Sequence, residues 1–238
     1  LSALLFIFIL YKKPELMSSF LYKFKDKATS FILSVVIVLL DLPPFIFYRQ
    51  GAKTLYTNRS FYGGLKVTED KALRYLVHGQ ILHGAQTKEG EKQKLPITYY
   101  GESSGIGLAF KIHPKRVLGE SMSVGDLGLG VGTVASFCKP GDKFVFYEIN
   151  PDVIKVANEY FSYLSGCNDT KVILGDGRLS LAKETEKFDI LIVDAFKDYA
   201  IPINLLTKAE FAIYFQRLFT SGFLAIHTSN RNLDLAPP

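Results

Sequence analysis

A glycine-rich turn followed by an acidic residue is the part of the sequence best suited to ligand chemistry. Residues 123–133 read SVGDLGLGVGT, with turn glycines at Gly128, Gly130 and Gly132. Glu148 follows Gly128 by twenty positions, at the end of the next apolar run. Glycine lets a backbone turn sharply and approach a ligand closely, and a carboxylate at the next strand end can accept both hydroxyls of a ribose. The spacing predicts a pocket for an adenosine-containing cofactor.

The spacing of the glycines favours one class of cofactor. Dinucleotide-binding turns read G-x-G-x-x-G, whereas the third glycine here comes one residue early and Thr133 follows it. The pattern therefore fits S-adenosylmethionine-type sites better than NAD sites. Asp176, between two glycines, adds a second acidic residue to the predicted pocket. A tight strand-to-helix turn would also explain the glycines, and Gly-Asp-Gly is an ordinary turn sequence.

Apolar runs and helical segments alternate from residue 122 onward, which is typical of an α/β fold with a parallel, doubly wound sheet. Strands are expected at 122–127, 144–149, 172–174, 188–193 and 223–227, with helices that begin at 133 and cover 151–164 and 207–219. Ligands bind such sheets at the carboxyl ends of the strands. The glycine turn, Glu148, Asp176 and Asp194 fall at predicted strand ends, so we expect one shared site, although a strand-end aspartate can also be a plain turn residue.

The residues before this pattern predict a smaller, β-rich unit. Residues 60–67 and 72–77 have the composition of strands, and the polar stretch 86–95 has that of a loop. The predicted organisation is an apolar segment over 1–50, a small β-rich subdomain over 59–100 and a Rossmann-like nucleoside-binding domain over 101–238.

The charge of the chain is concentrated at its beginning. The net charge is +5 over 238 residues, and residues 1–60 hold eight Lys and Arg against three Asp and Glu, so the rest of the chain is balanced. A nucleic-acid surface would need a clustered basic excess in the folded domain. We therefore expect no nucleic-acid partner.

Two apolar stretches flank a basic loop in the first 48 residues. The stretch 1–10 contains one polar residue, and 29–48 contains Asp41 as its only charge. About twenty apolar residues suffice to span a bilayer, so we expect a membrane-associated protein, attached through residues 1–48, with its catalytic-type domain in the cytoplasm. The alternative is a buried core helix over 31–40. The chain begins with Leu and resembles a piece of a longer protein.

Cysteines and histidines give no metal-binding pattern. Cys138 and Cys167 match no ligand spacing, and we expect unpaired thiols, although the sequence does not exclude a disulfide. His78 and His83 lack a third ligand at a suitable distance along the chain, so we predict a turn or pocket-wall role and no metal. His227 lies in an apolar run and is interpreted as a core histidine.

The ordered series of motifs resembles the spermidine synthase superfamily, and among its members the bacterial membrane-fused, transporter-like proteins most. The likeness covers roughly residues 59–235, and its motifs are RSFYGGLKV, YLVHGQILHGAQ, PITYYGESSGIG, GDLGLGVGT, FYEINPDVIKVANEYF, VILGDGRLSL, KFDILIVDAF and IPINLLTKAEF. The resemblance implies a β-rich subdomain before a methyltransferase-like Rossmann domain whose last strands follow Asn230. It also implies a pocket for S-adenosylmethionine or its decarboxylated form.

The resemblance also implies roles for individual residues. Glu148 takes the ribose-binding position, Asp176 with Gly177 matches the adenine-contacting pair, and Asp194 stands where spermidine synthases carry the catalytic aspartate. That aspartate accepts a proton from the attacking amine or holds the amine near the electrophile. The positions matched to the amine pocket are Gln86, Tyr99, Tyr100 and Asp198.

Two departures from the family pattern leave the activity open. Val131 stands where spermidine synthases carry an aspartate in the glycine loop, and the stretch from Asp194 to Asp198 differs in spacing from the usual D-x-x-D-P. The first hypothesis is transfer of an aminopropyl or related group to a small-molecule amine. The second is a methyltransferase, which the loss of the loop aspartate favours, and the third is a non-catalytic nucleoside-binding domain. A homodimer is left open.

Overall fold

A computed structural model describes residues 52–79, 81–196 and 202–227. The chain divides into two units, Leu1–Ala52 and Lys53–Pro238, and all the described helices and strands belong to the second unit. The apolar stretches 1–10 and 29–48 lie outside the described residues, so membrane attachment stays a prediction. Within the described part, no helix is long and apolar enough to cross a membrane.

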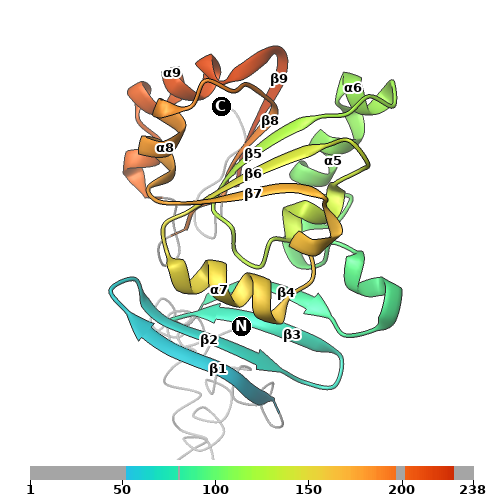
Figure 1. The fold of residues 1–238 in the computed structure, drawn as a ribbon, viewed down its shortest axis with the longest axis vertical. Helices are drawn as coiled ribbons and strands as arrows, with labels where there is room; N and C mark the ends of the chain where they lie inside the picture. The colour runs from blue at the N-terminus through green and yellow to red at the C-terminus, as the bar shows by residue number, and fades with distance from the viewer. Residues whose placement is uncertain (1–51, 80, 197–201, 228–238) are drawn as a thin grey trace, which may run out of the picture. The chain divides into compact units, whose positions relative to one another are not determined.

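The centre of the second unit is a five-stranded parallel sheet with the strand order β7-β6-β5-β8-β9 (Figure 1). Its strands are β5 (Ser123–Leu127), β6 (Lys143–Glu148), β7 (Asp169–Leu174), β8 (Phe188–Val193) and β9 (Leu218–Ile226). Each of the five overlaps a strand predicted from the sequence. All neighbouring pairs are parallel, which confirms the predicted α/β sheet.

Side-chain alternation along β8 shows how the two faces of the sheet are covered. Ile190 and Ile192 point into one core cluster, and Leu191 and Val193 point into the other. The first face packs against α5 (Gly105–Ile112) and α7 (Pro151–Tyr160), and the second against α8 (Gly177–Lys183) and α9 (Lys208–Gln216). All six residues of β8 are buried, as expected for the central region of a sheet covered on both sides.

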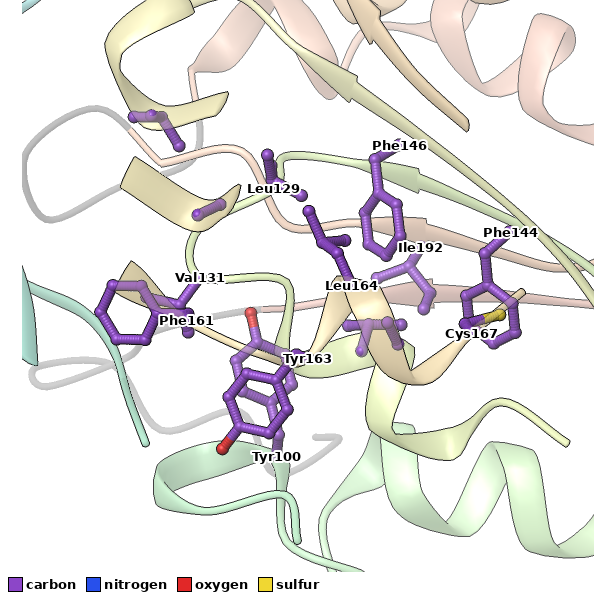
Figure 2. Close-up of a cluster of buried hydrophobic side chains, with 14 of the residues drawn as sticks. Tyr100, Leu129, Val131, Phe144, Phe146, Phe161, Tyr163, Leu164, Cys167 and Ile192 are labelled. Carbon is purple, nitrogen blue, oxygen red and sulfur yellow. The ribbon is translucent and has the colours of Figure 1, made fainter. Parts of the chain in front are cut away.

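A second sheet is antiparallel, with the order β1-β2-β3-β4. Its strands are β1 (Lys53–Ser60), β2 (Gly63–Glu69), β3 (Leu73–His78) and β4 (Ile81–Thr87). Helix α7 lies between the two sheets (Figure 1), and Asp152 on this helix accepts a hydrogen bond from Asn58 of β1 at 2.9 Å. Leu65 and Leu76 of the small sheet belong to the same buried cluster as Phe146 of the large one. The two sheets therefore share one core, part of which Figure 2 shows.

The remaining elements are short. They are the helix α6 (Pro114–Val117) and the 3-10 helices η1 (Gly90–Lys94), η2 (Thr98–Tyr100), η3 (Thr133–Phe137), η4 (Leu164–Gly166) and η5 (Ile203–Leu205). In the sequence, η1, η2 and α6 lie between the two sheets, and η3, η4 and η5 lie between elements of the large sheet. The sequence analysis predicted a helix beginning at residue 133, and the structure has only the single 3-10 segment η3 there. The predicted loop 86–95 instead begins with the end of β4 and contains η1.

Two predicted helix ends were wrong. Helix 151–164 ends at Tyr160, because the next residues turn to the small sheet: the Ser162 amide donates to the Gln86 side chain at 3.1 Å, and Tyr163 donates to Ala85. Helix 207–219 ends at Gln216, and Gly222, expected to stop it, lies inside β9. A side chain at position 222 would meet the Phe188 carbonyl oxygen at 3.0 Å, so glycine serves close strand packing there.

Cys138 and Cys167 form a disulfide, and the expectation of two unpaired thiols was wrong. Their Cα atoms are 5.6 Å apart, which lies within the ordinary range for a bridge. The two cysteines follow η3 and η4 directly, and these segments pack together because the Leu164 side chain lies over Gly132. The bond therefore ties the segment after the glycine turn to the segment after α7.

Reduction of this disulfide is expected to destabilise the folded domain. The bond closes a loop between residues 29 positions apart, and loss of such a closure costs about 3–4 kcal/mol because the unfolded chain gains freedom. Urea unfolding with and without a phosphine reductant measures the difference. The C138S/C167S double variant is the control and should unfold at one midpoint in both conditions. Labelling of both thiols in folded, unreduced protein would contradict the bond.

Candidate functional site

A cavity of about 1090 Å³ lies at the carboxyl ends of the parallel strands. Its walls include eight of the residues predicted from the sequence, namely Tyr99, Tyr100, Gly128, Gly130, Glu148, Asp176, Gly177 and Asp194. Residues of the small sheet, among them Tyr62, His78 and His83, line it as well. The volume matches that of small-molecule sites. The predicted strand-end residues are thus brought together, and the antiparallel sheet supplies part of the enclosure.

The glycine turn after β5 passes too close to its neighbours for side chains. Gly128 has a φ of 118°, and a Cβ atom there would lie 2.6 Å from the Asp194 carbonyl oxygen. Gly130 has a φ of 53°, and a Cβ there would lie 2.8 Å from the His83 carbonyl oxygen. Both positions need glycine for conformation and for space. Gly132 also has a positive φ but packs against Leu164 and does not line the cavity.

Glu148 is held at the end of β6 by the backbone of two turns. Its Oε2 accepts from the Leu129 amide at 3.1 Å, and its Oε1 accepts from the Asn150 amide at 2.8 Å. The residue is 9 % exposed and lines the cavity. Burial raises the pKa of Glu148, and the backbone hydrogen bonds oppose that rise. The Ile149 amide adds a third backbone contact, and a carboxylate has about four lone-pair positions, so acceptor capacity remains for a ligand.

A second carboxyl group, Asp126, is buried beside Glu148. It stands on β5 and is 2 % exposed, and its Oδ1 has no hydrogen-bond partner among the described residues. Burial, together with the Glu148 charge, raises the pKa of Asp126 well above its usual range. The sequence analysis did not single out this residue. The shift extends the pH range over which Asp126 keeps its proton, because two neighbouring buried carboxyl groups oppose each other's ionisation.

Asp176 lines the cavity but is already engaged with its own helix. As the N-cap of α8 it accepts from the Arg178 amide at 2.9 Å, and the Arg178 guanidinium donates to its Oδ2 at 3.0 Å. Burial opposes ionisation, but the hydrogen bonds from Arg178 prevail and the pKa of Asp176 is lowered. The ordinary capping role anticipated for a Gly-Asp-Gly turn is therefore present, next to the wall of the cavity.

Asp194, at the end of β8, has a protein partner on each carboxylate oxygen. The Tyr100 hydroxyl donates to Oδ2, and Nδ1 of His227 lies 2.5 Å from Oδ1. Burial raises the pKa of Asp194, and the contact with His227 opposes the rise. Tyr99 packs beside the pair, with its ring centroid 4.7 Å from that of His227 and the two rings tilted by 40°.

His227 is the residue that the sequence analysis misjudged. It was interpreted as a core histidine, whereas it lines the cavity with a side chain that is 23 % exposed. A signal was available: the residue is the last of a predicted strand, at the end where site residues of a parallel sheet gather. The apolar neighbours of His227 in the sequence concealed that placement.

Three other residues from the sequence analysis lie away from the cavity or outside the described chain. Gln86 is buried, and its amide binds the Gln93 carbonyl and the Ser162 hydroxyl, so it ties β4 to the segment after α7. Val131 is 1 % exposed and packs over Gly84, where a Cβ would lie 2.5 Å from its Cγ2. Asp198 is outside the described residues.

The two histidines of the small sheet form part of the cavity wall. Their ring centroids are 5.3 Å apart, and His78 Nε2 lies 2.6 Å from the Tyr62 carbonyl oxygen. Burial, together with His78, lowers the pKa of His83 to about 4, so His83 is neutral at pH 7. Across residues 52–79, 81–196 and 202–227 there is no group of three His, Cys, Asp or Glu side chains arranged to hold a metal ion.

Replacing Gly128 by alanine should damage both the fold and the site. The Cβ would meet the Asp194 carbonyl at 2.6 Å in a backbone conformation that side chains rarely adopt, at a cost of about 2 kcal/mol or more. Urea unfolding measures the loss, and calorimetry with methylthioadenosine measures the affinity. Gly105→Ala is the matched control, since nothing lies within 4 Å of its Cβ. Wild-type stability of Gly128→Ala would contradict the packing described.

Asp126→Asn should change how stability depends on pH. Because the pKa of Asp126 is raised by folding, the unfolded chain releases this proton at lower pH than the folded one. The loss of wild-type stability that the buried Asp126 causes is absent below about pH 4 and grows as the pH rises. The variant should therefore gain stability relative to wild type between pH 4 and pH 7 in urea unfolding. Asp70→Asn should show no such gain, because backbone and Tyr75 hydrogen bonds lower the pKa of Asp70. A stability difference between Asp126→Asn and wild type that does not change with pH would contradict the raised pKa of Asp126.

The sequence is similar to curated polyamine aminopropyltransferases. It is 27 % identical over 184 residues to the polyamine aminopropyltransferase of Vibrio vulnificus, covering 73 % of this chain and 58 % of that protein. It is 26 % identical over 212 residues to a probable polyamine aminopropyl transferase of Bifidobacterium longum, covering 85 % of this chain and 44 % of that protein. The chain thus spans about half the length of these relatives. No family model matches it.

Solved spermidine synthases share the fold. The spermidine synthase of Thermotoga maritima aligns with a TM-score of 0.57 and 18 % identity, over 75 % of this chain and 58 % of that one. A probable spermidine synthase of Corynebacterium glutamicum aligns with a TM-score of 0.56 and 15 % identity, over 73 % and 62 %. These likenesses show the Rossmann-like fold of the methyltransferase type. The likeness to polyamine aminopropyltransferases is therefore one of sequence, and the likeness to spermidine synthases is one of fold.

Proposed function

We propose that this chain carries the nucleoside-binding and catalytic part of a spermidine synthase-like transferase, which moves an aminopropyl group from decarboxylated S-adenosylmethionine to a small-molecule amine. The observation that carries the proposal is the single cavity in which Glu148 and Asp194 stand on either side of the glycine turn. Related proteins named polyamine aminopropyltransferases support it.

The residues present fit the nucleoside of such a co-substrate. Glu148 keeps acceptor capacity beyond its backbone hydrogen bonds, and a carboxylate that lines the cavity can accept from ribose hydroxyls. Gly128 and Gly130 leave the backbone bare at the cavity wall. Gly177 and Asp176 line the same cavity as Glu148, and we place the adenine ring beside them.

The co-substrate supplies the electrophile, a carbon next to a sulfonium. The protein binds the sugar through Glu148, holds the acceptor near Asp194 and Tyr100, and receives the proton that the amine loses. The acceptor lone pair forms the new N–C bond, and the electrons of the breaking C–S bond pass to sulfur. Tyr99 and Asp198 are proposed to shape the acceptor side.

The methyltransferase hypothesis relied on Val131, which was taken to replace a charged side chain that faces the ligand. In the structure Val131 is buried against Gly84 and is not part of the cavity wall. The side chain at position 131 therefore has no direct influence on the charge of the ligand site.

Two further features of the whole protein stay proposals. Attachment to a membrane through residues 1–48, as in transporter-fused relatives, is supported by the two apolar stretches around a basic loop. A homodimer is a proposal that rests on the family resemblance.

Turnover tests the proposed reaction. Purified protein given decarboxylated S-adenosylmethionine and a panel of di- and polyamines should release methylthioadenosine, measured by chromatography. Asp194→Asn should reduce the rate at least 100-fold, because it removes the negative charge beside the reacting amine. Methyl transfer from S-adenosylmethionine without any release of methylthioadenosine would favour the alternative reaction.

Editing the ribose tests the role of Glu148 without changing the fold. The 2′-deoxy analogue of methylthioadenosine should bind wild-type protein about 10-fold to 100-fold more weakly than methylthioadenosine itself, because it loses a hydrogen bond to a charged carboxylate. Calorimetry measures both affinities. In Glu148→Gln the difference should shrink below about threefold. Equal affinities in wild type would exclude Glu148 as the ribose ligand.

A further inference from the structure

The end of β9 delivers a histidine to the aspartate at the end of β8. The His227 amide donates to the Val193 carbonyl at 3.0 Å, which extends the parallel pairing of β8 and β9 by one residue. Asp194 is the next residue after Val193, so the backbone places the two side chains at neighbouring strand ends. The juxtaposition is therefore fixed by sheet register and not by a loop.

The imidazole ring of His227 has a defined orientation. Nδ1 faces Asp194 Oδ1 at 2.5 Å, and the ring lies between two aromatic neighbours, with centroid distances of 4.7 Å to Tyr99 and 4.8 Å to Phe196. Nε2 has no hydrogen-bond partner within the described part of the chain. Since Asp194 is almost completely buried and His227 is partly exposed in the cavity, the imidazole is the more accessible of the two groups.

Asp194 is less accessible to an acceptor than His227. Its Oδ2 receives the Tyr100 hydroxyl and its Oδ1 faces His227, and its side chain is 6 % exposed. A carboxylate held in this way fixes the tautomer of an adjacent imidazole, with the proton on Nδ1 and the lone pair on Nε2. The same pairing stabilises the imidazolium that forms when Nε2 accepts a proton.

We propose that Asp194 and His227 act as a dyad, in which Nε2 of His227 is the general base for the acceptor amine and Asp194 is its positioning residue. This proposal rests on the proposed transferase function. Nε2 takes one proton from the acceptor ammonium and thereby frees the nitrogen lone pair. The lone pair forms the N–C bond, the C–S electrons go to sulfur, and the product leaves as a protonated secondary amine and a neutral thioether. The proton on His227 then passes to solvent through the open side of the cavity.

The substitution His227→Gln removes the proposed base and keeps a hydrogen bond to Asp194. A glutamine amide can still donate to Asp194 but cannot accept a proton at neutral pH. The variant should keep the unfolding midpoint and the methylthioadenosine affinity of wild type and lose about 100-fold or more in kcat. A kcat within threefold of wild type, in an active enzyme, would overturn the dyad.

Chemical rescue provides a readout that a merely structural role would not move. His227→Ala opens space at the cavity wall, so added imidazole should restore at least 10-fold of its lost rate, and imidazoles of different basicity should restore it to different extents. Wild-type enzyme with the same additives is the control and should show no stimulation. An active wild type combined with no rescue of a folded His227→Ala would overturn the base role. If His227→Ala does not fold, His227→Gln alone decides.

Nitrogen NMR of the imidazole tests the dyad independently of turnover. Protein labelled with 15N-histidine should show His227, assigned by its loss in His227→Gln, with the proton on Nδ1 in wild type. A proton on Nε2 would overturn the dyad even in an active enzyme. A wild-type protein with the expected tautomer but no release of methylthioadenosine with any amine would instead overturn the proposed function, and the base role with it.

Discussion

The glycine turn after β5 lies in direct contact with the end of β8, and this contact sets the geometry of the whole site. With no side chain at Gly128, the turn reaches within van der Waals distance of the Asp194 carbonyl. The glycine turn, which is proposed to hold the nucleoside, therefore lies next to Asp194, whose carboxylate is proposed to serve the proton chemistry. A methyl group at Gly128 would push the glycine turn away from Asp194, because the buried residues of β8 hold that strand in place.

Glu148 extends this arrangement to the neighbouring strand. One of its oxygens holds the amide of Leu129 in the glycine turn, and the other holds the amide of Asn150, the N-cap of α7. The same carboxylate thus fixes two turns and faces the cavity. Helix α7 is in turn hydrogen-bonded to the small sheet through Asp152. The antiparallel strands are therefore linked to the ligand site through a continuous set of polar contacts.

The sequence predicted the parallel sheet well because buried strands are nearly continuous apolar runs, as in the six residues of β8. It also placed Glu148 and Asp194 at one edge, since chain order and parallel pairing suffice for that inference. It failed where tertiary contacts decide. Gly222 resembles a helix stop but serves strand packing, and Gln86 resembles a ligand residue but bridges two segments. The position of His227 at a strand end was concealed by its apolar neighbours in the sequence. Nothing in the spacing of Cys138 and Cys167 indicates that η3 and η4 lie together.

Whether the bond between these two cysteines forms depends on the redox state of the compartment that holds the protein. Disulfides persist in oxidising compartments and are rare in the cytosol, where glutathione keeps thiols reduced. A domain kept in the cytoplasm, as the sequence analysis expected, would hold Cys138 and Cys167 as a dithiol. The segment after the glycine turn would then be joined to η4 by packing alone. Protein produced in a reducing host and protein produced in a periplasm would share one sequence and differ in this covalent connection.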